Sequence, residues 1–117
     1  MKRYAFSRLE HLRSTSQFRE VYSRGKRASN ERLVVVALAN DLAYSRLGIS
    51  VSKRVGMAAV RNRLKRLIRE AFRLGKEQLP KGFDIIVIPR RGCERKLEVI
   101  RASLQELFLR ACQRASG

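Results

Sequence analysis

The feature that most constrains this chain is a strongly basic, amphipathic segment at residues 60–73, which lies between two stretches typical of β-strands. On a helix with about 100° per residue, the apolar side chains share one face: Val60, Leu64, Leu67, Ala71 and Leu74. The opposite face is polar and basic: Asn62, Lys65, Arg66, Arg69 and Arg73. Arg61 and Arg63 lie on the flanks, and only Glu70 interrupts the positive charge. Because a solvated helix face usually mixes both signs, we expect this helix to pack on a core and to present its basic side to an anionic partner.

Three short segments predict strands around this helix. Residues 33–38 are rich in β-branched side chains. Residues 46–52 alternate between apolar and small side chains, and residues 83–88 form a third apolar run that Pro89 ends. A short loop joins the first two segments, so we expect them to pair antiparallel. The helix between the second and the third makes a β-α-β crossover, which requires those two strands to be parallel.

The small side chains of residues 46–52 leave one face of that strand open: Gly48, Ser50 and Ser52. A ligand could approach this face, and a helix could equally pack closely against it. Periodicity does not separate the two.

Two further helices are predicted. The first covers residues 15–24, with Ser14 and Gln17 in a capping-box pattern and Gly25 as the stop. The last runs from about 96 to 114 and carries an apolar stripe: Leu97, Ile100, Leu104, Leu107, Phe108 and Ala111. Residues 25–30 are predicted to be a basic, turn-rich connector. The chain as a whole leaves room for one further small strand, whose position the sequence pattern does not give. The fold class is therefore α+β, a small mixed β-sheet packed with helices in the order α-β-β-α-β-α.

The length of 117 residues fits a single domain, predicted here as an RNA-binding domain over residues 1–117. Residues 1–13 are expected to be a flexible basic arm, and residues 113–117 a frayed tail. The two cysteines, Cys93 and Cys112, make neither a disulfide framework nor a zinc site. We therefore expect reduced thiols and a cytoplasmic protein. The longest apolar run, at residues 33–39, is too short to span a bilayer, so no membrane partner is expected.

The charge balance points to a nucleic acid. The chain has 27 Lys and Arg residues against 10 Asp and Glu, a formal net charge of +17. A body with this charge repels itself, and a nucleic acid would neutralise it with release of counterions. Strands on both sides of the basic helix argue against a helix-turn-helix, and the predicted strand at 33–38 lacks the aromatic residues of an RNA-recognition sheet. Binding to an RNA backbone is the class that remains.

Residues for autonomous catalysis are missing from the sequence. The only aspartates are Asp41 and Asp84, and no carboxylate pair has the spacing of a two-metal site. The single histidine, His11, cannot supply both a general acid and a general base, and it is interpreted as structural. The residues therefore favour binding over catalysis.

Residues 61–69, Arg-Asn-Arg-Leu-Lys-Arg-Leu-Ile-Arg, closely resemble the bacterial ribonuclease P protein component, a family marked by Arg-Asn-Arg at the start of a basic helix. Residues 48–56, residues 18–22 with Gly25, and residues 83–88 are similar to other parts of the family, so the resemblance covers about residues 8–112. It implies the protein subunit of a ribonucleoprotein endonuclease that removes the 5′ leader of precursor tRNA. The RNA subunit would carry the active site and its magnesium ions. The protein itself would have no catalytic residue, bind no cofactor or metal, and be monomeric within the complex.

The resemblance also implies site residues. The resemblance places the contacts with the catalytic RNA on the basic helix and the loop before it: Lys53, Arg54, Arg61, Asn62, Arg63, Lys65, Arg66 and Arg69. Arg73 is added because it lies on the same basic face of the predicted helix. The leader would occupy a cleft between the first helix and the sheet, with Phe18, Tyr22 and the open-face Ser50. Periodicity alone favours core packing for the two rings.

One residue of this sequence departs from the family, and one feature of the family departs from a general rule. Val36 replaces a cleft aromatic seen in some relatives, so leader stacking, worth roughly 1–3 kcal/mol per base, is expected to be weaker or shifted. The family crossover is left-handed, against a general rule that would predict the right-handed form.

Two other functions stay open from the sequence. A structural RNA binder, such as a ribosomal-type protein, would carry the same charge without leader-dependent activity. A self-sufficient metal nuclease would cleave RNA alone and would lose this activity on replacement of Asp41 or Asp84.

Overall fold

A computed structural model describes residues 10–116 and confirms the α+β class. The elements in chain order are α1 (Thr15–Arg24), β1 (Lys26–Ser29), β2 (Leu33–Ala39), β3 (Arg46–Ile49), the 3-10 helix η2 (Lys53–Val55), α2 (Ala58–Leu74), β4 (Phe83–Pro89) and α3 (Leu97–Ser116). The first helix begins where the sequence predicts because its capping box forms. Ser14 Oγ accepts from the Gln17 N–H at 3.1 Å, and Gln17 Oε1 accepts from the Ser14 N–H at 3.1 Å.

The sheet has the order β1-β2-β4-β3, with β2 and β4 as its two inner strands. β2 pairs antiparallel with β4 from Leu33 opposite Pro89, and β3 pairs parallel with β4 from Arg46 opposite Asp84. The parallel pairing across the crossover is thus confirmed, and its left-handed sense stays a prediction. The expected antiparallel pairing of residues 33–38 with 46–52 is wrong, because β4 lies between them. Five of the seven residues of β4 are buried, as expected for a strand of a sheet whose two faces are both covered by helices.

Residues 26–29 form strand β1 instead of the predicted connector. This strand pairs antiparallel with β2 from Lys26 opposite Ala37. Only Ala28 points into the core, and the other three side chains are exposed. A short edge strand of basic residues carries no apolar alternation, which is why the sequence pattern missed it. At the other edge, β3 ends at Ile49, three residues before the predicted strand does, because Ser52 caps η2.

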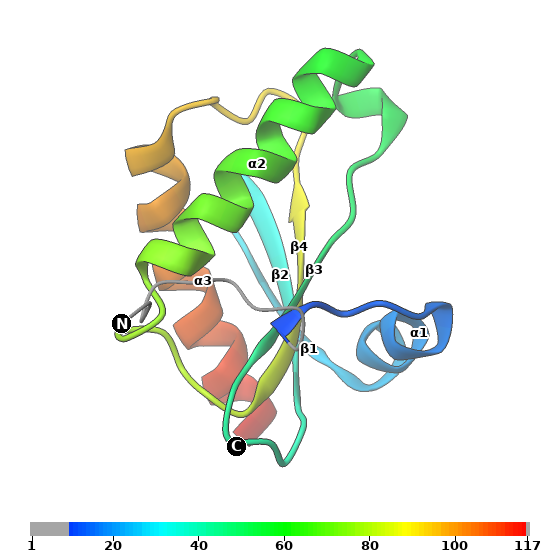
Figure 1. Ribbon diagram of the computed structural model, residues 1–117, viewed down its shortest axis with the longest axis vertical. Coiled ribbons are helices and arrows are strands. Elements are labelled where there is room, and N and C mark those ends of the chain that lie inside the picture. The colour runs from blue at the N-terminus through cyan, green and yellow to red at the C-terminus, as the bar shows by residue number, and fades with distance from the viewer. Residues whose placement is uncertain (1–9, 117) are drawn as a thin grey trace.

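Helices cover both faces of the sheet (Figure 1): α2 and α3 lie on one side, and α1 lies on the other. The larger core fills the α2 and α3 side, where Leu33, Val35, Ile85 and Val87 of the sheet meet the helices. The smaller core under α1 consists of four buried residues: Leu12, Val21, Val36 and Ile86. The sheet therefore holds α1 and α2 at fixed positions on opposite faces.

The described residues at both ends of the chain take part in the fold. Within the predicted arm, residues 10–13 are part of the fold: Leu12 is buried, its N–H donates to the Leu47 carbonyl at 3.0 Å, and His11 forms a parallel bridge with Leu47. Residues 1–9 of that arm lie outside the described residues. At the other end, α3 continues through Ser116, so residues 113–116 of the predicted tail are helical, and residue 117 lies outside the described residues. Fraying of this end stays a prediction. The predicted apolar stripe of α3 is confirmed from Ile100 onward.

The buried face of α2 is rotated from the predicted one. Leu64, Ile68, Ala71 and Phe72 are buried, whereas Leu67 is only partly buried. Three of these residues, Leu64, Ile68 and Phe72, are spaced four apart. The helix packs against both the sheet and α3, so its buried face is wider than a stripe that meets one neighbour. The opposite side stays in solvent.

Candidate RNA-binding site

The solvent side of α2 carries the predicted cluster of polar and cationic side chains. Asn62, Arg63, Arg66 and Arg69 are exposed and Lys65 is partly exposed. Within residues 10–116, none of the four cations forms an ion pair or a side-chain hydrogen bond with a carboxylate. We call these five residues the basic ridge. The buried Leu64 and Ile68 behind it fix the helix, so the ridge is held in place by the core.

Two predicted contact residues on α2 have structural roles of their own. Arg61 Nε donates to the Gly56 carbonyl at 3.1 Å and so ties the loop after η2 to the helix. Arg73 forms an ion pair with Glu70, one turn earlier, and the hydrogen bond from Arg73 holds the pKa of the Glu70 carboxyl below its usual value. The charge of Arg73 is therefore largely compensated. This pair has the i,i+3 spacing that a helix brings together, and the sequence analysis did not use it.

Lys53 and Arg54 lie on η2, immediately before α2. Both side chains are exposed. Ser52 Oγ accepts from the Arg54 N–H at 3.1 Å, which caps this short helix. Figure 1 shows η2 beside the start of α2, so these two cations extend the ridge at its N-terminal end.

The predicted leader-binding residues lie on the α1 face. Tyr22 is 37% exposed, while Phe18 is partly buried against the sheet. A Cβ added at Gly48 would lie 2.6 Å from Phe18 Cζ, so the small residue there admits the ring of α1. Ser50 is partly exposed and follows the last residue of β3. Val36 is fully buried beneath α1, so an aromatic side chain at this position would have to displace the helix.

A small pocket connects the two faces at the β3 edge of the sheet. It has a volume of about 220 Å³ and is lined by Phe18 from α1, by Lys65 and Arg69 from α2, and by His11 and Gly48. Burial, followed by the charges of Arg13 and Arg69, lowers the pKa of His11. The sequence analysis did not assign His11 to a site, since its position beside Lys65 and Arg69 depends on the tertiary structure.

The aspartate considered for a nuclease site has a structural partner. Arg46 donates to both carboxylate oxygens of Asp84, at 2.8 and 2.7 Å, and Asn40 Nδ2 donates to Oδ1 at 2.8 Å. Asp41 stands in a turn with φ of 61°. In the described part of the chain, no three His, Cys, Asp or Glu side chains come together as metal ligands would. Within the same part, none of the helices combines the length and apolar character of a membrane span.

The fold and the ridge define a class: a small α+β protein that presents an exposed basic helix on one face of its sheet. The Ribonuclease P family model matches residues 6–112, and the chain belongs to this family. Its members are the protein subunits of ribonuclease P, a ribonucleoprotein endoribonuclease, so this chain acts in tRNA processing.

Individual relatives agree over most of the chain. The ribonuclease P protein component of Thermotoga maritima is 42% identical over 114 residues, which cover 97% of both proteins. That of Clostridioides difficile is 50% identical over 86 residues, 73% of this chain and 75% of the relative. The structure of the T. maritima protein in complex with 1-(4-fluorophenyl)-2-thiourea matches with a TM-score of 0.79 at 42% identity, covering 86% of this chain and 98% of that one.

Proposed function

We propose that this protein binds the catalytic RNA of ribonuclease P through the basic ridge and η2, and the 5′ leader of precursor tRNA through the α1 face. The observation that carries the proposal is the set of four cations on α2 that have no carboxylate partner within residues 10–116. Arginine and lysine side chains in this state are ready to pair with phosphates and to release counterions. Arg61 takes part as a positioning residue for the η2 loop, and Arg73 is assigned a minor role.

The leader path is argued from the α1 face. Tyr22 exposes enough of its ring to stack on a base, and Phe18 forms part of the pocket at the β3 edge. Lys65 and Arg69 of α2 line the same pocket as Phe18. An RNA leader that leaves the α1 face would therefore meet these two cations directly. Aromatic and cationic groups in alternation are typical of sites for single-stranded RNA.

The chemistry is assigned to the RNA partner. In this proposal the catalytic RNA holds the magnesium ions that activate water, and the protein neutralises phosphates and orients the leader. We further propose a monomeric protein in a cytoplasmic complex. Asp84 has no catalytic part here, since its carboxylate accepts three hydrogen bonds from Arg46 and Asn40.

The test is cleavage of a precursor tRNA at low magnesium by the protein alone, by a bacterial ribonuclease P RNA alone, and by the two together. The proposal expects efficient cleavage only in the mixture, and stronger stimulation for a substrate with a long leader than for one with a single leader nucleotide. Tyr22→Ala should reduce this leader dependence, and Tyr22→Phe, which keeps the ring, should preserve it. Tight RNA binding without stimulation would favour a structural binder, and cleavage by the protein alone would favour a nuclease.

A further inference from the structure

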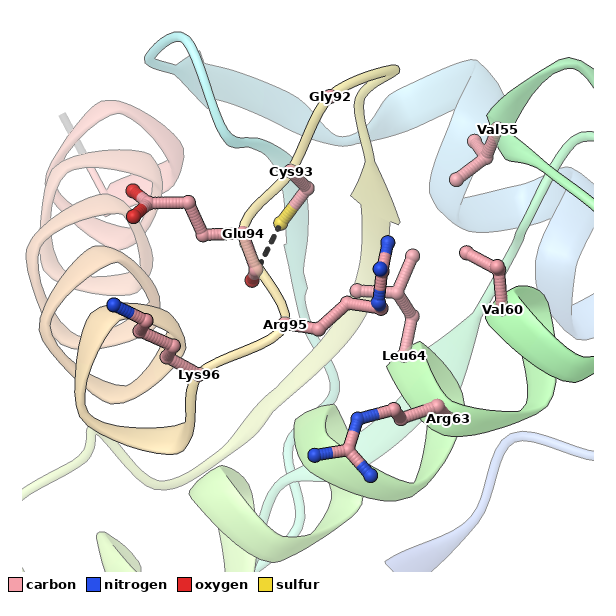
Figure 2. Close-up of a pocket in the computed structure, with 9 residues that line it drawn as sticks. All are labelled: Val55, Val60, Arg63, Leu64, Gly92, Cys93, Glu94, Arg95 and Lys96. Atoms are coloured by element: carbon pink, nitrogen blue, oxygen red, sulfur yellow. Dashed lines mark hydrogen bonds between the residues drawn. The ribbon is translucent and has the colours of Figure 1, made fainter.

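A second groove lies on the other flank of α2, away from the α1 face. It has a volume of about 560 Å³, within the range of about 300–1,000 Å³ typical of ligand sites. One wall is α2 with Val55 before it, and the other is the loop that joins β4 to α3. Figure 2 shows the nine lining residues. None of the binding roles assigned above uses the loop side of this groove.

The floor of the groove is apolar and its rim is basic. Val55, Val60, Leu64 and Cys93 line the floor, with Leu64 and Cys93 buried. Three cationic residues belong to the lining, Arg63, Arg95 and Lys96. The Arg63 and Arg95 side chains border the floor, and the Lys96 ammonium points away from it (Figure 2). In Figure 2 the Arg95 side chain extends from the loop toward Leu64 on α2, so its guanidinium lies over the floor.

The one acidic residue of the lining does not cancel this charge. Glu94 Oε1 accepts from Arg32 Nε at 3.2 Å, and its carboxylate points away from the groove (Figure 2). Among residues 10–116, no carboxylate pairs with Arg63, Arg95 or Lys96. The groove thus presents an excess of positive charge beside an apolar surface, which matches the phosphate and the base of one nucleotide.

Both walls are held in place without a ligand. The Cys93 N–H donates to the Arg90 carbonyl at 3.0 Å, and Cys93 is buried in the larger core, which anchors the loop. Across the groove, the bond from Arg61 to Gly56 fixes the segment that carries Val55. A preformed site of this kind loses little conformational entropy when it is filled.

We propose that this groove binds one unstacked nucleotide of the catalytic RNA, with the base between Val60 and the Arg95 guanidinium and the phosphate at Arg63. This inference rests on the proposed function, because it requires the catalytic RNA as partner. That RNA is the source of the nucleotide, since Arg63 continues the basic ridge while the leader-binding face lies on the opposite flank of α2.

The experiment measures binding of a bacterial ribonuclease P RNA, without substrate, to four variants of the full chain. Val60→Phe fills the floor and keeps every charge, and Val55→Phe fills it from the other side in case the first variant does not fold. The pair Arg95→Ala and Lys96→Ala removes rim charges. The matched control, Arg101→Ala with Lys81→Ala, removes one arginine and one lysine from exposed positions outside the groove. Thermal unfolding monitored by circular dichroism checks the fold of each.

The proposal expects both filled variants to bind at least about fivefold more weakly with an unchanged salt dependence, as for the loss of one stacked base. The rim pair should also bind more weakly, more than the control does. Chemical probing of the RNA should show one unpaired nucleotide that the wild type protects and a filled variant leaves reactive. Wild-type affinity in both filled variants would overturn the inference. An effect of the rim pair alone would also overturn it, because that result would show a general contribution of positive charge and no nucleotide in the groove. Altered preference for precursor over mature tRNA would assign the groove to the leader and overturn it too. Failure of the wild-type protein to bind this RNA would instead refute the proposed function.

Discussion

The strongest quantitative prediction concerns Arg66→Ala combined with Arg69→Ala on the basic ridge. Both side chains are exposed and have no carboxylate partner within residues 10–116, so each is free to neutralise one phosphate. Each lost phosphate contact should reduce the slope of log K against log salt by about 0.7–0.9. The double variant should therefore lose about 1.4–1.8 from this slope. Between 50 and 200 mM salt, the wild-type affinity for the catalytic RNA should fall about 7–12-fold more than that of the variant.

The assay is equilibrium binding of the catalytic RNA by fluorescence anisotropy at three or more salt concentrations and constant magnesium. Arg101→Ala with Arg110→Ala on α3 is the control, because it removes the same number of positive charges away from the ridge. It should weaken binding slightly at all salt concentrations and leave the slope near the wild-type value. A slope unchanged in the ridge variant would remove these two arginines from the interface and refute the assignment of the ridge.

Three further predictions test the fold and the electrostatics. Ile68→Ala should reduce the free energy of unfolding by about 2–5 kcal/mol, as for a fully buried side chain, and Leu67→Ala by less; urea titration that gives the reverse order would contradict the rotated face of α2. Asp84→Asn leaves the Arg46 guanidinium without its countercharge and should reduce the free energy of unfolding by about 3 kcal/mol. This value is near the lower end for buried pairs, because the Arg46 side chain remains 23% exposed. The variant should still stimulate the catalytic RNA, and loss of that activity in folded protein would indicate a direct role for Asp84. Because burial lowers the pKa of His11 in the fold, the unfolded chain takes up this proton first, so the free energy of unfolding should decrease as pH falls through the unfolded value near 6.5. His11→Gln should weaken that dependence between pH 7.5 and 5.5, and thermal melts with identical pH profiles would count against it.

Local signals in the sequence were sufficient for the helices. The Ser14 and Gln17 side chains set the start of α1, and Gly75 follows the last residue of α2, because caps and periodicity act within one turn of the backbone. The chain position and the outward direction of the basic ridge followed from the same periodicity. Such features depend on near neighbours in sequence and are readable without the fold.

Long-range arrangements were not readable. The short loop between β2 and β3 suggested a hairpin, but β4 lies between these two strands. The order of the strands depends on how the whole sheet pairs, which the pattern of a single segment does not show. The pocket at the β3 edge likewise joins His11 to α2, more than 50 positions apart in sequence.

The inner position of β4 also has a consequence for synthesis of the protein. During translation, β2 and β3 leave the ribosome well before residues 83–89, and neither strand can complete its ladder until β4 arrives. Strands with open edges are prone to pair with other chains, and pairings distant in sequence form slowly. A nascent chain that ends before β4 would display the basic helix without the completed sheet that holds α2 and α1 on its opposite faces. Competence to bind both RNA and leader should therefore arise late and in one step, when β4 takes its place.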